Sequence, residues 1–344
     1  MEIQRHGGDV YRHKEVIDFS SNMNPLGTPQ GVLEAARESL LNIVHYPDCF
    51  CTELRQAIAK AESVPMEWVL CGNGAAELLF SLTLARKPER ALLVSPSFLE
   101  YEQALKAVDC DMEYLNLKEE EGFQVTGELL GHLTEELDVL FLCNPNNPTG
   151  LLIERELVLE ILEACREHHI LLVLDECFLD FVDGREEYEV SDCLRDYPNL
   201  FLLKAFTKRY AIAGIRLGYG LCSDELLLER MGEVTQPWNV SIPAQAAGIA
   251  ALRETEYVRR GIEMIRTERD YLMREMRSMG LSVFDSRANY IFFRGPKELY
   301  EQALEAGFLI RDCRNYRGLT AGYYRIAVRT HAENERLMTW LRQL

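Results

Sequence analysis

Apolar runs of strand length alternate with amphipathic helical patterns from about residue 68 to residue 223. The clearest runs, at 91–95, 139–143, 170–174 and 200–203, are apolar throughout rather than alternating. Continuous apolar strands are typical of a sheet buried on both faces, and the strand–helix alternation is typical of a mostly parallel sheet. We therefore expect an α/β fold in which helices cover both faces of a parallel sheet.

The pattern changes after a strand expected at 217–221. Long helical patterns follow, the longest over 254–279, and a compact strand and helix pattern runs from residue 282 to the end. A chain of 344 residues is long enough for about two domains. We expect an N-terminal segment (1–35) that packs with the small domain, a large domain (36–236) and a small C-terminal domain (237–344).

The formal net charge of −18 argues against nucleic acid or an anionic membrane as a partner, because both attract basic surfaces. An anionic substrate must therefore find a local basic pocket. No stretch reaches the length of about 20 apolar residues that spans a bilayer, so we expect a cytoplasmic protein.

The ten cysteines are scattered through apolar strands and helices, where a thiol packs as a small hydrophobe, and they do not suggest a disulfide framework. Cys49 and Cys51 form a C-x-C pair beside His45, but no second ligand pair stands at zinc spacing. We expect packing there and no metal site.

The segment 71–77 follows a short apolar strand and opens a helix. Its glycines, Gly74 among them, let the backbone approach a ligand, and the helix N-terminus at Ala75 and Ala76 offers N–H groups to a phosphate. A purely structural turn is the alternative. A dinucleotide site would need a third glycine where this chain has Glu77.

Two further strand ends carry polar side chains, at the sheet edge where ligands of such folds bind. The loop 144–150, Asn-Pro-Asn-Asn-Pro-Thr-Gly, is rigid and presents amide donors, although it could be structural only. Asp175 ends an apolar run and needs a partner to offset its desolvation. A protonated pyridine nitrogen would serve, and a helix cap or a salt bridge is the alternative.

Lys208 comes shortly after the apolar run 200–203, preceded by Thr207 and followed by Arg216 before the next strand. A partly desolvated lysine is a nucleophile toward an aldehyde, and Thr207 and Arg216 would hold an anion beside it. A solvated surface lysine is the alternative.

A basic group set among tyrosines near the end of the chain suggests an anion site, with a strand edge balanced by surface acids as the alternative. Its members are Arg311, Arg314, Arg325 and Arg329.

Together and in this order, these motifs resemble the fold-type I pyridoxal-phosphate enzymes, in the branch that contains histidinol-phosphate aminotransferase and threonine-phosphate decarboxylase. The resemblance covers nearly the whole chain. It is most specific at 144–150, at Asp-Glu-Cys-Phe (175–178) and over 206–219. It implies a mostly parallel seven-stranded sheet in a large domain and a smaller α+β domain.

The resemblance implies pyridoxal 5'-phosphate as the cofactor, carried by Lys208 as a Schiff base, with Asp175 paired to the pyridine nitrogen. Tyr46 would complete the phosphate site of a neighbouring subunit, which implies a homodimer with shared active sites. Phe178 stands where many relatives have a tyrosine, so a hydrogen bond to the ring oxygen is missing and simple transamination is less expected. The other implied cofactor contacts are Gly74, Ala75, Ala76, Phe98, Asn147, Thr207 and Arg216.

Within this branch, the segments 6–9, 19–27 and 315–329 are more similar to the decarboxylases. The implied reaction is decarboxylation of L-threonine O-3-phosphate to (R)-1-aminopropan-2-ol O-2-phosphate for cobalamin biosynthesis. The alternatives are a histidinol-phosphate aminotransferase and a cofactor-binding regulatory protein without turnover. The substrate, a small phosphorylated amino acid, would contact His6, Gly7, Asn22, Asn147, Arg311 and Arg325, with Arg325 steering the carboxylate.

Overall fold

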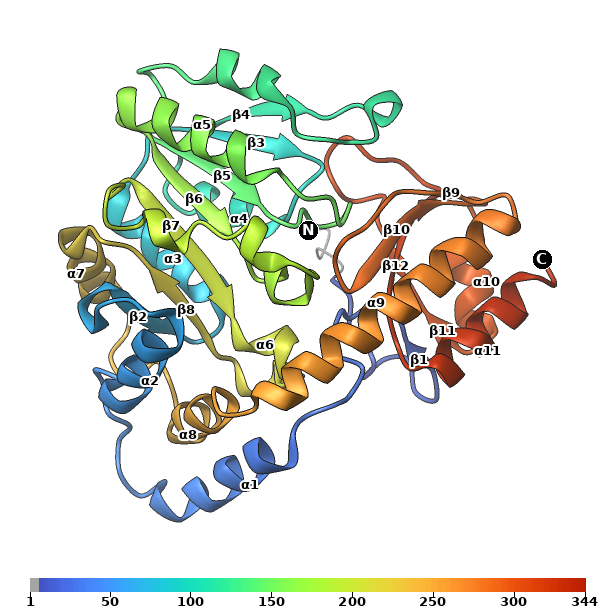
Figure 1. Ribbon diagram of the computed structural model, residues 1–344, viewed down its shortest axis with the longest axis horizontal. Helices are drawn as coiled ribbons and strands as arrows, with labels where there is room; N and C mark the ends of the chain where they lie inside the picture. The colour runs from blue at the N-terminus through green and yellow to red at the C-terminus, as the bar shows by residue number, and fades with distance from the viewer. Residues whose placement is uncertain (1–5) are drawn as a thin grey trace.

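The structure, a computed structural model that describes residues 6–344, is built around a seven-stranded sheet in the order β2-β8-β7-β6-β5-β3-β4 (Figure 1). Every strand of this sheet is parallel to the others except β8, which is antiparallel to both of its neighbours. The seven-stranded, mostly parallel sheet is therefore confirmed. Its strands are β2 (Val69–Gly72), β3 (Arg90–Ser95), β4 (Asp111–Asn116), β5 (Val139–Cys143), β6 (Leu171–Asp175), β7 (Leu200–Ala205) and β8 (Gly218–Leu221).

Helices cover both faces of the large sheet, because alternate side chains of the strands enter two separate cores. Leu93 and Val173 pack in the core that includes α3 and α4, whereas Leu92 and Leu172 pack in the core that includes α2 and α5. This burial on both faces explains the continuous apolar runs. The helices of this part are α1 (Gln30–Ser39), α2 (Thr52–Glu62), α3 (Ala75–Arg86), α4 (Glu100–Lys106), α5 (Arg155–Glu167), α6 (Phe206–Arg209), α7 (Glu225–Val234) and α8 (Ile242–Ala251).

A four-stranded antiparallel sheet lies to one side of the large sheet, in the order β12-β13-β10-β9 (Figure 1). The long helix α9 extends from beside α6 to this smaller sheet. A capping box formed by Thr330 and Glu333 starts the last helix. The elements here are α9 (Thr255–Ser278), β9 (Ser282–Val283), β10 (Tyr290–Arg294), α10 (Leu299–Glu305), β11 (Phe308–Leu309), β12 (Arg311–Asp312), β13 (Tyr323–Ala327) and α11 (His331–Leu341).

The N-terminal strand β1 (Ile17–Asp18) pairs in parallel with β11, so this early segment lies against the C-terminal part of the chain. Helix α8 packs instead against α1 and α2. The domain bounds at 35/36 and 236/237 stay a prediction.

The carboxyl ends of the parallel strands meet at the edge of the large sheet that faces the smaller one, and the arrowheads of β3 and β5 point toward β10 and β12 (Figure 1). Loops that follow parallel strands gather at one edge for this reason. Within residues 6–344, none of the helices has the length and apolar character needed to cross a membrane.

Candidate active site

Asp175 ends β6 at this edge of the large sheet, and its side chain is buried. Its Oδ1 accepts a hydrogen bond from the backbone N–H of Cys177 (2.9 Å), and its Oδ2 accepts one from the hydroxyl of Tyr101 (2.6 Å). Burial raises the pKa of Tyr101 well above its usual value, and the charge of Asp175 raises it further. The tyrosine therefore keeps its proton, and two donors hold the carboxylate in place.

Lys208 lies in α6, the short helix that follows β7. Its ammonium is 5.6 Å from the centroid of the Phe178 ring, and its carbonyl accepts a hydrogen bond from the backbone N–H of Asn24 (3.0 Å). Burial raises the pKa of the Cys143 thiol well above its usual value, Asp175 raises it further, and Lys208 lowers it. Because β6 and β7 are neighbouring parallel strands, Asp175 at the end of β6 and Lys208 just after β7 lie at the same edge of the large sheet.

Three segments meet at the N-terminus of α3. Gly74 precedes this helix with φ +79°, and a Cβ at this glycine would lie 2.5 Å from Nη2 of Arg216. A Cβ on Gly218 would lie 2.5 Å from the backbone nitrogen of Ala75. The hydroxyl of Thr207 donates a hydrogen bond to the carbonyl of Leu217, the residue before β8 (3.5 Å). The helix N–H groups, the hydroxyl and the guanidinium form a donor set typical of a phosphate site. Its residues are Gly74, Ala75, Ala76, Thr207 and Arg216.

Asn147, in the loop after β5, connects the large sheet to the smaller one. Its buried Oδ1 accepts hydrogen bonds from the hydroxyl of Tyr316 (3.3 Å) and from Nη1 of Arg325. The loop itself is fixed by Asn146, whose Nδ2 donates to the carbonyl of Pro96 (3.0 Å). The Asn147 side chain is thus held between the two sheets.

Arg311 and Arg325 lie opposite each other on β12 and β13, and both are buried. Arg325 Nη2 donates to the carbonyl of Ser20 (3.0 Å), and Arg311 Nη2 donates to Oδ1 of Asn315 (2.8 Å). Among residues 6–344 neither arginine forms an ion pair with a carboxylate, and Nε of Arg325 has no hydrogen-bond partner. Two buried guanidiniums without a counter-ion are suited to an anionic ligand.

The start of the described chain docks beside this pair. A Cβ on Gly7 would lie 2.3 Å from the carbonyl oxygen of Ser20, so only glycine allows this approach. His6 Nδ1 lies 3.0 Å from Oε1 of Glu100. Asn22 is buried, and its Oδ1 has no partner within the described residues. Because the Ser20 carbonyl also accepts a hydrogen bond from Arg325, the structure places Gly7 beside that arginine, with His6 next to it in the chain.

Phe98 follows β3, and its ring centroid lies 5.5 Å from that of Tyr101 in an edge-on arrangement. Tyr46 is exposed and stacks on Trp238 of the same chain, with centroids 4.4 Å apart. The contribution of Tyr46 to the site of a neighbouring subunit stays a prediction.

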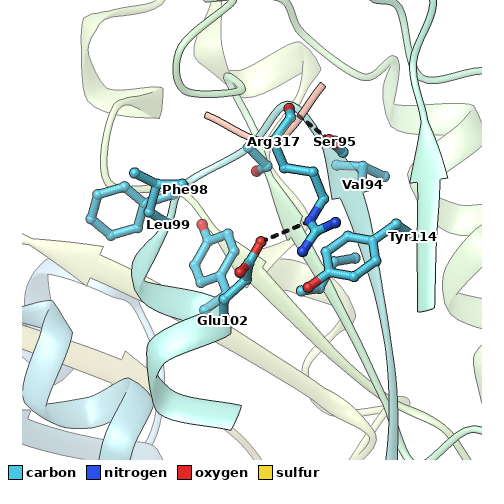
Figure 2. Close-up of a pocket in the computed structure, with 10 residues that line it drawn as sticks. Val94, Ser95, Phe98, Leu99, Glu102, Tyr114 and Arg317 are labelled. Atoms are coloured by element: carbon cyan, nitrogen blue, oxygen red, sulfur yellow. Dashed lines mark hydrogen bonds and ion pairs between the residues drawn. The ribbon is translucent and has the colours of Figure 1, made fainter. Parts of the chain in front are cut away.

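The loop between β12 and β13 is held against the end of β3 (Figure 2). Ser95 Oγ donates to the carbonyl of Arg317 (2.8 Å), and Arg317 Nε donates to Oε1 of Glu102 (3.1 Å). The Arg317 guanidinium also lies 3.8 Å from the centroid of the Tyr114 ring, and Figure 2 shows it between Glu102 and Tyr114. These contacts fix the loop that carries Tyr316.

The other two arginines of the predicted basic group pair with acids near them in the smaller part. Arg314 pairs with Asp312 and with Glu301 (3.5 Å). Arg329 pairs with Glu333 (2.7 Å), beside the start of α11. Both side chains have a structural explanation that does not involve a ligand.

Cys49 is exposed, whereas Cys51 is buried at the start of α2. A hydrogen bond with Cys71 lowers the pKa of the Cys51 thiol. In the part of the chain that the structure describes, no group of three histidine, cysteine or acidic side chains is arranged to hold a metal.

Two residues of the site were missed by sequence reasoning, Tyr101 and Glu100. Both belong to the segment 95–101, Ser-Pro-Ser-Phe-Leu-Glu-Tyr, which follows β3. Their position after a parallel strand was the available signal, and it singled out only Phe98. Neither the spacing nor the composition of this segment distinguishes a carboxylate that contacts His6 from a solvated one.

Known proteins match the chain over nearly its full length. The family model "Aminotransferase class I and II" matches residues 14–341. The chain is 40% identical to a threonine-phosphate decarboxylase of Salmonella typhimurium strain LT2, over 98% of this chain and 96% of that protein. The matches confirm the predicted fold and the predicted resemblance.

Solved structures give the same picture. The histidinol-phosphate aminotransferase from Clostridium acetobutylicum has a TM-score of 0.88 at 29% identity, with 94% of this chain and 98% of that one covered. The L-threonine-O-3-phosphate decarboxylase from Porphyromonas gingivalis has a TM-score of 0.81 at 28% identity, with the same coverage of 94% and 98%.

Proposed function

Because the chain belongs to the aminotransferase class I and II family, we propose that it is a pyridoxal-phosphate enzyme that decarboxylates L-threonine O-3-phosphate. The product is (R)-1-aminopropan-2-ol O-2-phosphate, which we assign to cobalamin biosynthesis. The observation that carries this proposal is the pair of buried arginines, Arg311 and Arg325, beside Asn147. A substrate with a phosphate and a carboxylate presents two anions to these two guanidiniums.

The residues at the sheet edge fit pyridoxal phosphate. The space that a Cβ on Gly74 would fill lies beside Arg216, at a helix N-terminus, and suits the cofactor phosphate. Lys208 supplies an amine for the covalent link, and Asp175 supplies a buried carboxylate for the pyridine nitrogen. Asn147 has its oxygen engaged, which leaves its N–H groups for the ring hydroxyl. The further proposed contacts are Ala75, Ala76, Phe98, Phe178, Thr207 and the partner's copy of Tyr46.

When bound, pyridoxal phosphate draws electrons from the bond that breaks at the α-carbon. Decarboxylation then depends on which bond the protein aligns. Arg325 is fixed by Asn147 and by the Ser20 carbonyl, so its unpartnered Nε is held in one direction. We assign this group to the substrate carboxylate. Lys208 Nζ delivers a proton to the α-carbon after carbon dioxide leaves.

We assign the substrate phosphate to Arg311 and its neighbours, and not to Arg325, which takes the carboxylate. Arg311, His6 and Asn22 supply a guanidinium, an imidazole and an amide, and Gly7 lets the backbone of the N-terminal segment lie close to them. Arg311 stacks over the ring of Tyr316 at 5.2 Å, which fixes its plane. The two anions of the substrate are thus bound by different arginines.

We also propose that two copies form a dimer with shared sites. Exposed apolar side chains gather in the segment 40–50, where Leu41 is 86% exposed, Val44 is 81% exposed and Tyr46 is 76% exposed. Such a patch is unusual on a monomer, and a second copy would bury it and receive Tyr46. Sedimentation should give a dimer for the wild type, and Leu41→Glu with Val44→Glu should give a monomer. A wild-type monomer would overturn this assignment.

The test of the activity is a side-by-side assay. Purified protein loaded with pyridoxal phosphate receives phosphothreonine without a keto acid, or histidinol phosphate with 2-oxoglutarate. We expect carbon dioxide from phosphothreonine, and no release from the Lys208→Ala variant. Turnover of histidinol phosphate that depends on the keto acid, without carbon dioxide from phosphothreonine, would refute the proposal.

One observation favours the aminotransferase alternative, namely the higher TM-score of the histidinol-phosphate aminotransferase structure, 0.88 against 0.81. Overall backbone similarity says little about which bond is aligned at the α-carbon. In sequence, the chain is 40% identical to the Salmonella decarboxylase and 33% identical to a histidinol-phosphate aminotransferase of Methanothermobacter thermautotrophicus, which favours decarboxylation. The assay above separates the two.

A further inference from the structure

Glu100 begins α4 and forms an ion pair with His6, which precedes it by more than 90 positions in the sequence. The Glu100 Oε1 and His6 Nδ1 atoms are 3.0 Å apart, and the side chains are 14% and 51% exposed. The second oxygen of Glu100 is buried and has no hydrogen-bond partner among residues 6–344. Within the described chain, His6 is therefore the one group that forms an ion pair with this largely buried carboxylate.

The position of His6 relative to the arginines is set by its neighbours in the chain. Gly7 approaches the carbonyl of Ser20, and the backbone N–H of Gly8 donates to Oγ of the same serine (2.7 Å). The Ser20 carbonyl also accepts the hydrogen bond from Arg325. The N-terminal segment and the substrate arginine thus share one anchor, so His6 lies at a fixed place beside the site.

The charges around His6 oppose one another. The hydrogen bond with Glu100 raises the pKa of His6 above its usual 6.5, burial lowers it, the charge of Glu100 raises it, and Arg311 lowers it. Without Glu100, only burial and the charge of Arg311 would remain, and both lower the pKa of His6 and so disfavour its protonated form. Glu100 is therefore the group that keeps a second cation possible next to Arg311.

We propose that Glu100 is a positioning residue for the substrate phosphate. It accepts the Nδ1–H of His6 and keeps the ring protonated, so that the Nε2–H is free to donate to a phosphate oxygen beside Arg311. A dianionic phosphate is then bound by two cations that would otherwise repel each other. This inference rests on the proposed function and adds to it the residue that controls the charge of the phosphate site.

The test is the pH dependence of substrate binding in the Glu100→Gln variant. At pH 8 its KM for phosphothreonine should rise about tenfold, the order expected for loss of one charge-assisted hydrogen bond. As the pH is lowered toward 5, the His6 ring of the variant regains its proton, so the KM ratio of variant to wild type should fall toward one, and kcat should change little at either pH. A purely structural role would instead change KM by one factor at every pH.

Glu102→Gln is the matched control, because Glu102 lies on the same helix and contacts Arg317 rather than His6. Its effect on KM should not depend on pH. In a His6→Gln background, Glu100→Gln should have no further effect on KM, since the two residues act as one unit. The inference would be overturned if the ratio of KM between Glu100→Gln and the wild type were the same at every pH. It would also be overturned if Glu100→Gln raised KM as much in the His6→Gln background as in the wild type.

A readout independent of turnover separates this inference from the proposed function. The titration of His6, followed by NMR in the cofactor-loaded wild type and in Glu100→Gln, should show a lower His6 pKa in the variant. Inorganic phosphate should bind the variant more weakly than the wild type at pH 8, and this difference should diminish as the pH is lowered toward 5. If phosphothreonine is not decarboxylated, the proposed function fails, and these two measurements still decide whether Glu100 controls an anion site. Equal His6 titration in the two proteins would refute it.

Discussion

Replacing Glu176 by glutamine should stabilise the protein at pH 8 and leave its stability nearly unchanged at pH 5. Glu176 follows Asp175 and belongs to a buried ionic cluster around Lys204. The Lys204 ammonium lies 2.7 Å from Glu62, 3.1 Å from Glu189 and 3.5 Å from Glu176. Three carboxylates thus share one ammonium, and Glu176 is the most distant and has a fully buried side chain.

The magnitude follows from the titration of this group. Burial raises the pKa of Glu176 from 4.5 to about 7, with Lys204 opposing and the charges of Glu189 and Glu62 adding to the rise. Because the folded state binds the proton more tightly, the contribution of Glu176 to stability decreases as the pH rises from 4.5 to about 7. This loss is about 3 kcal/mol, since each pH unit corresponds to about 1.4 kcal/mol. For a chain of this length it corresponds to about 4 °C in Tm.

Glutamine carries no charge at either pH, so the variant should escape this loss. The assay is thermal and urea unfolding of wild type and Glu176→Gln at pH 5 and pH 8, at equal subunit and cofactor concentrations, because cofactor and subunit binding also affect Tm. Glu186→Gln, at an exposed neighbouring position, is the control and should behave as the wild type. A Glu176→Gln variant that is less stable than wild type at pH 8 would refute the reasoning, because the ion pair with Lys204 would then outweigh the desolvation.

Two further predictions concern the edges of the site. Gly218→Ala should weaken pyridoxal phosphate binding and destabilise the protein by about 1–3 kcal/mol, because its Cβ would lie 2.5 Å from the Ala75 nitrogen, whereas Gly214→Ala, with open space around it, should do neither. Cofactor titration and Tm measure both effects. Arg317→Ala should lower kcat/KM about threefold through loss of its contact over Tyr114, with little change in Tm, whereas Arg314→Ala should leave kcat/KM unchanged. Steady-state kinetics on phosphothreonine decide this, and equal effects of the two arginines would contradict it.

The large sheet could be predicted from sequence because its strands are buried on both faces. A short run of apolar residues such as 139–143 favours a strand that is buried on both faces, and the structure places β5 at those residues. The same reasoning identified the edge at which Asp175 and the loop 144–150 lie, since loops after parallel strands share one side of a sheet. These predictions needed only local patterns.

The cluster around Lys204 could not be predicted. Lys204 is the last residue but one of an otherwise apolar strand, and its partners come from positions 62, 176 and 189, on three separate segments. Glu62 lies at the end of an amphipathic helix, where an acid is usually solvated. Pairing among distant charges depends on how the elements pack, and no local spacing encodes it.

The role expected for the N-terminal segment comes from the sequence, and its contacts come from the structure. The sequence singled out His6 and Gly7 only through resemblance, and the structure adds the contact with Glu100 and the shared anchor at Ser20. The proposed cofactor contacts Asp175 and Lys208 lie at the edge of the large sheet, whereas Arg311 and Arg325 lie on the smaller one. Asn147 joins the two through its hydrogen bond with Arg325. Under the proposed function, any change in the relative position of the two sheets therefore moves the substrate carboxylate, assigned to Arg325, relative to Asp175 and Lys208. The bond that is broken then depends on contacts between the two sheets, such as the hydrogen bond between Asn147 and Arg325.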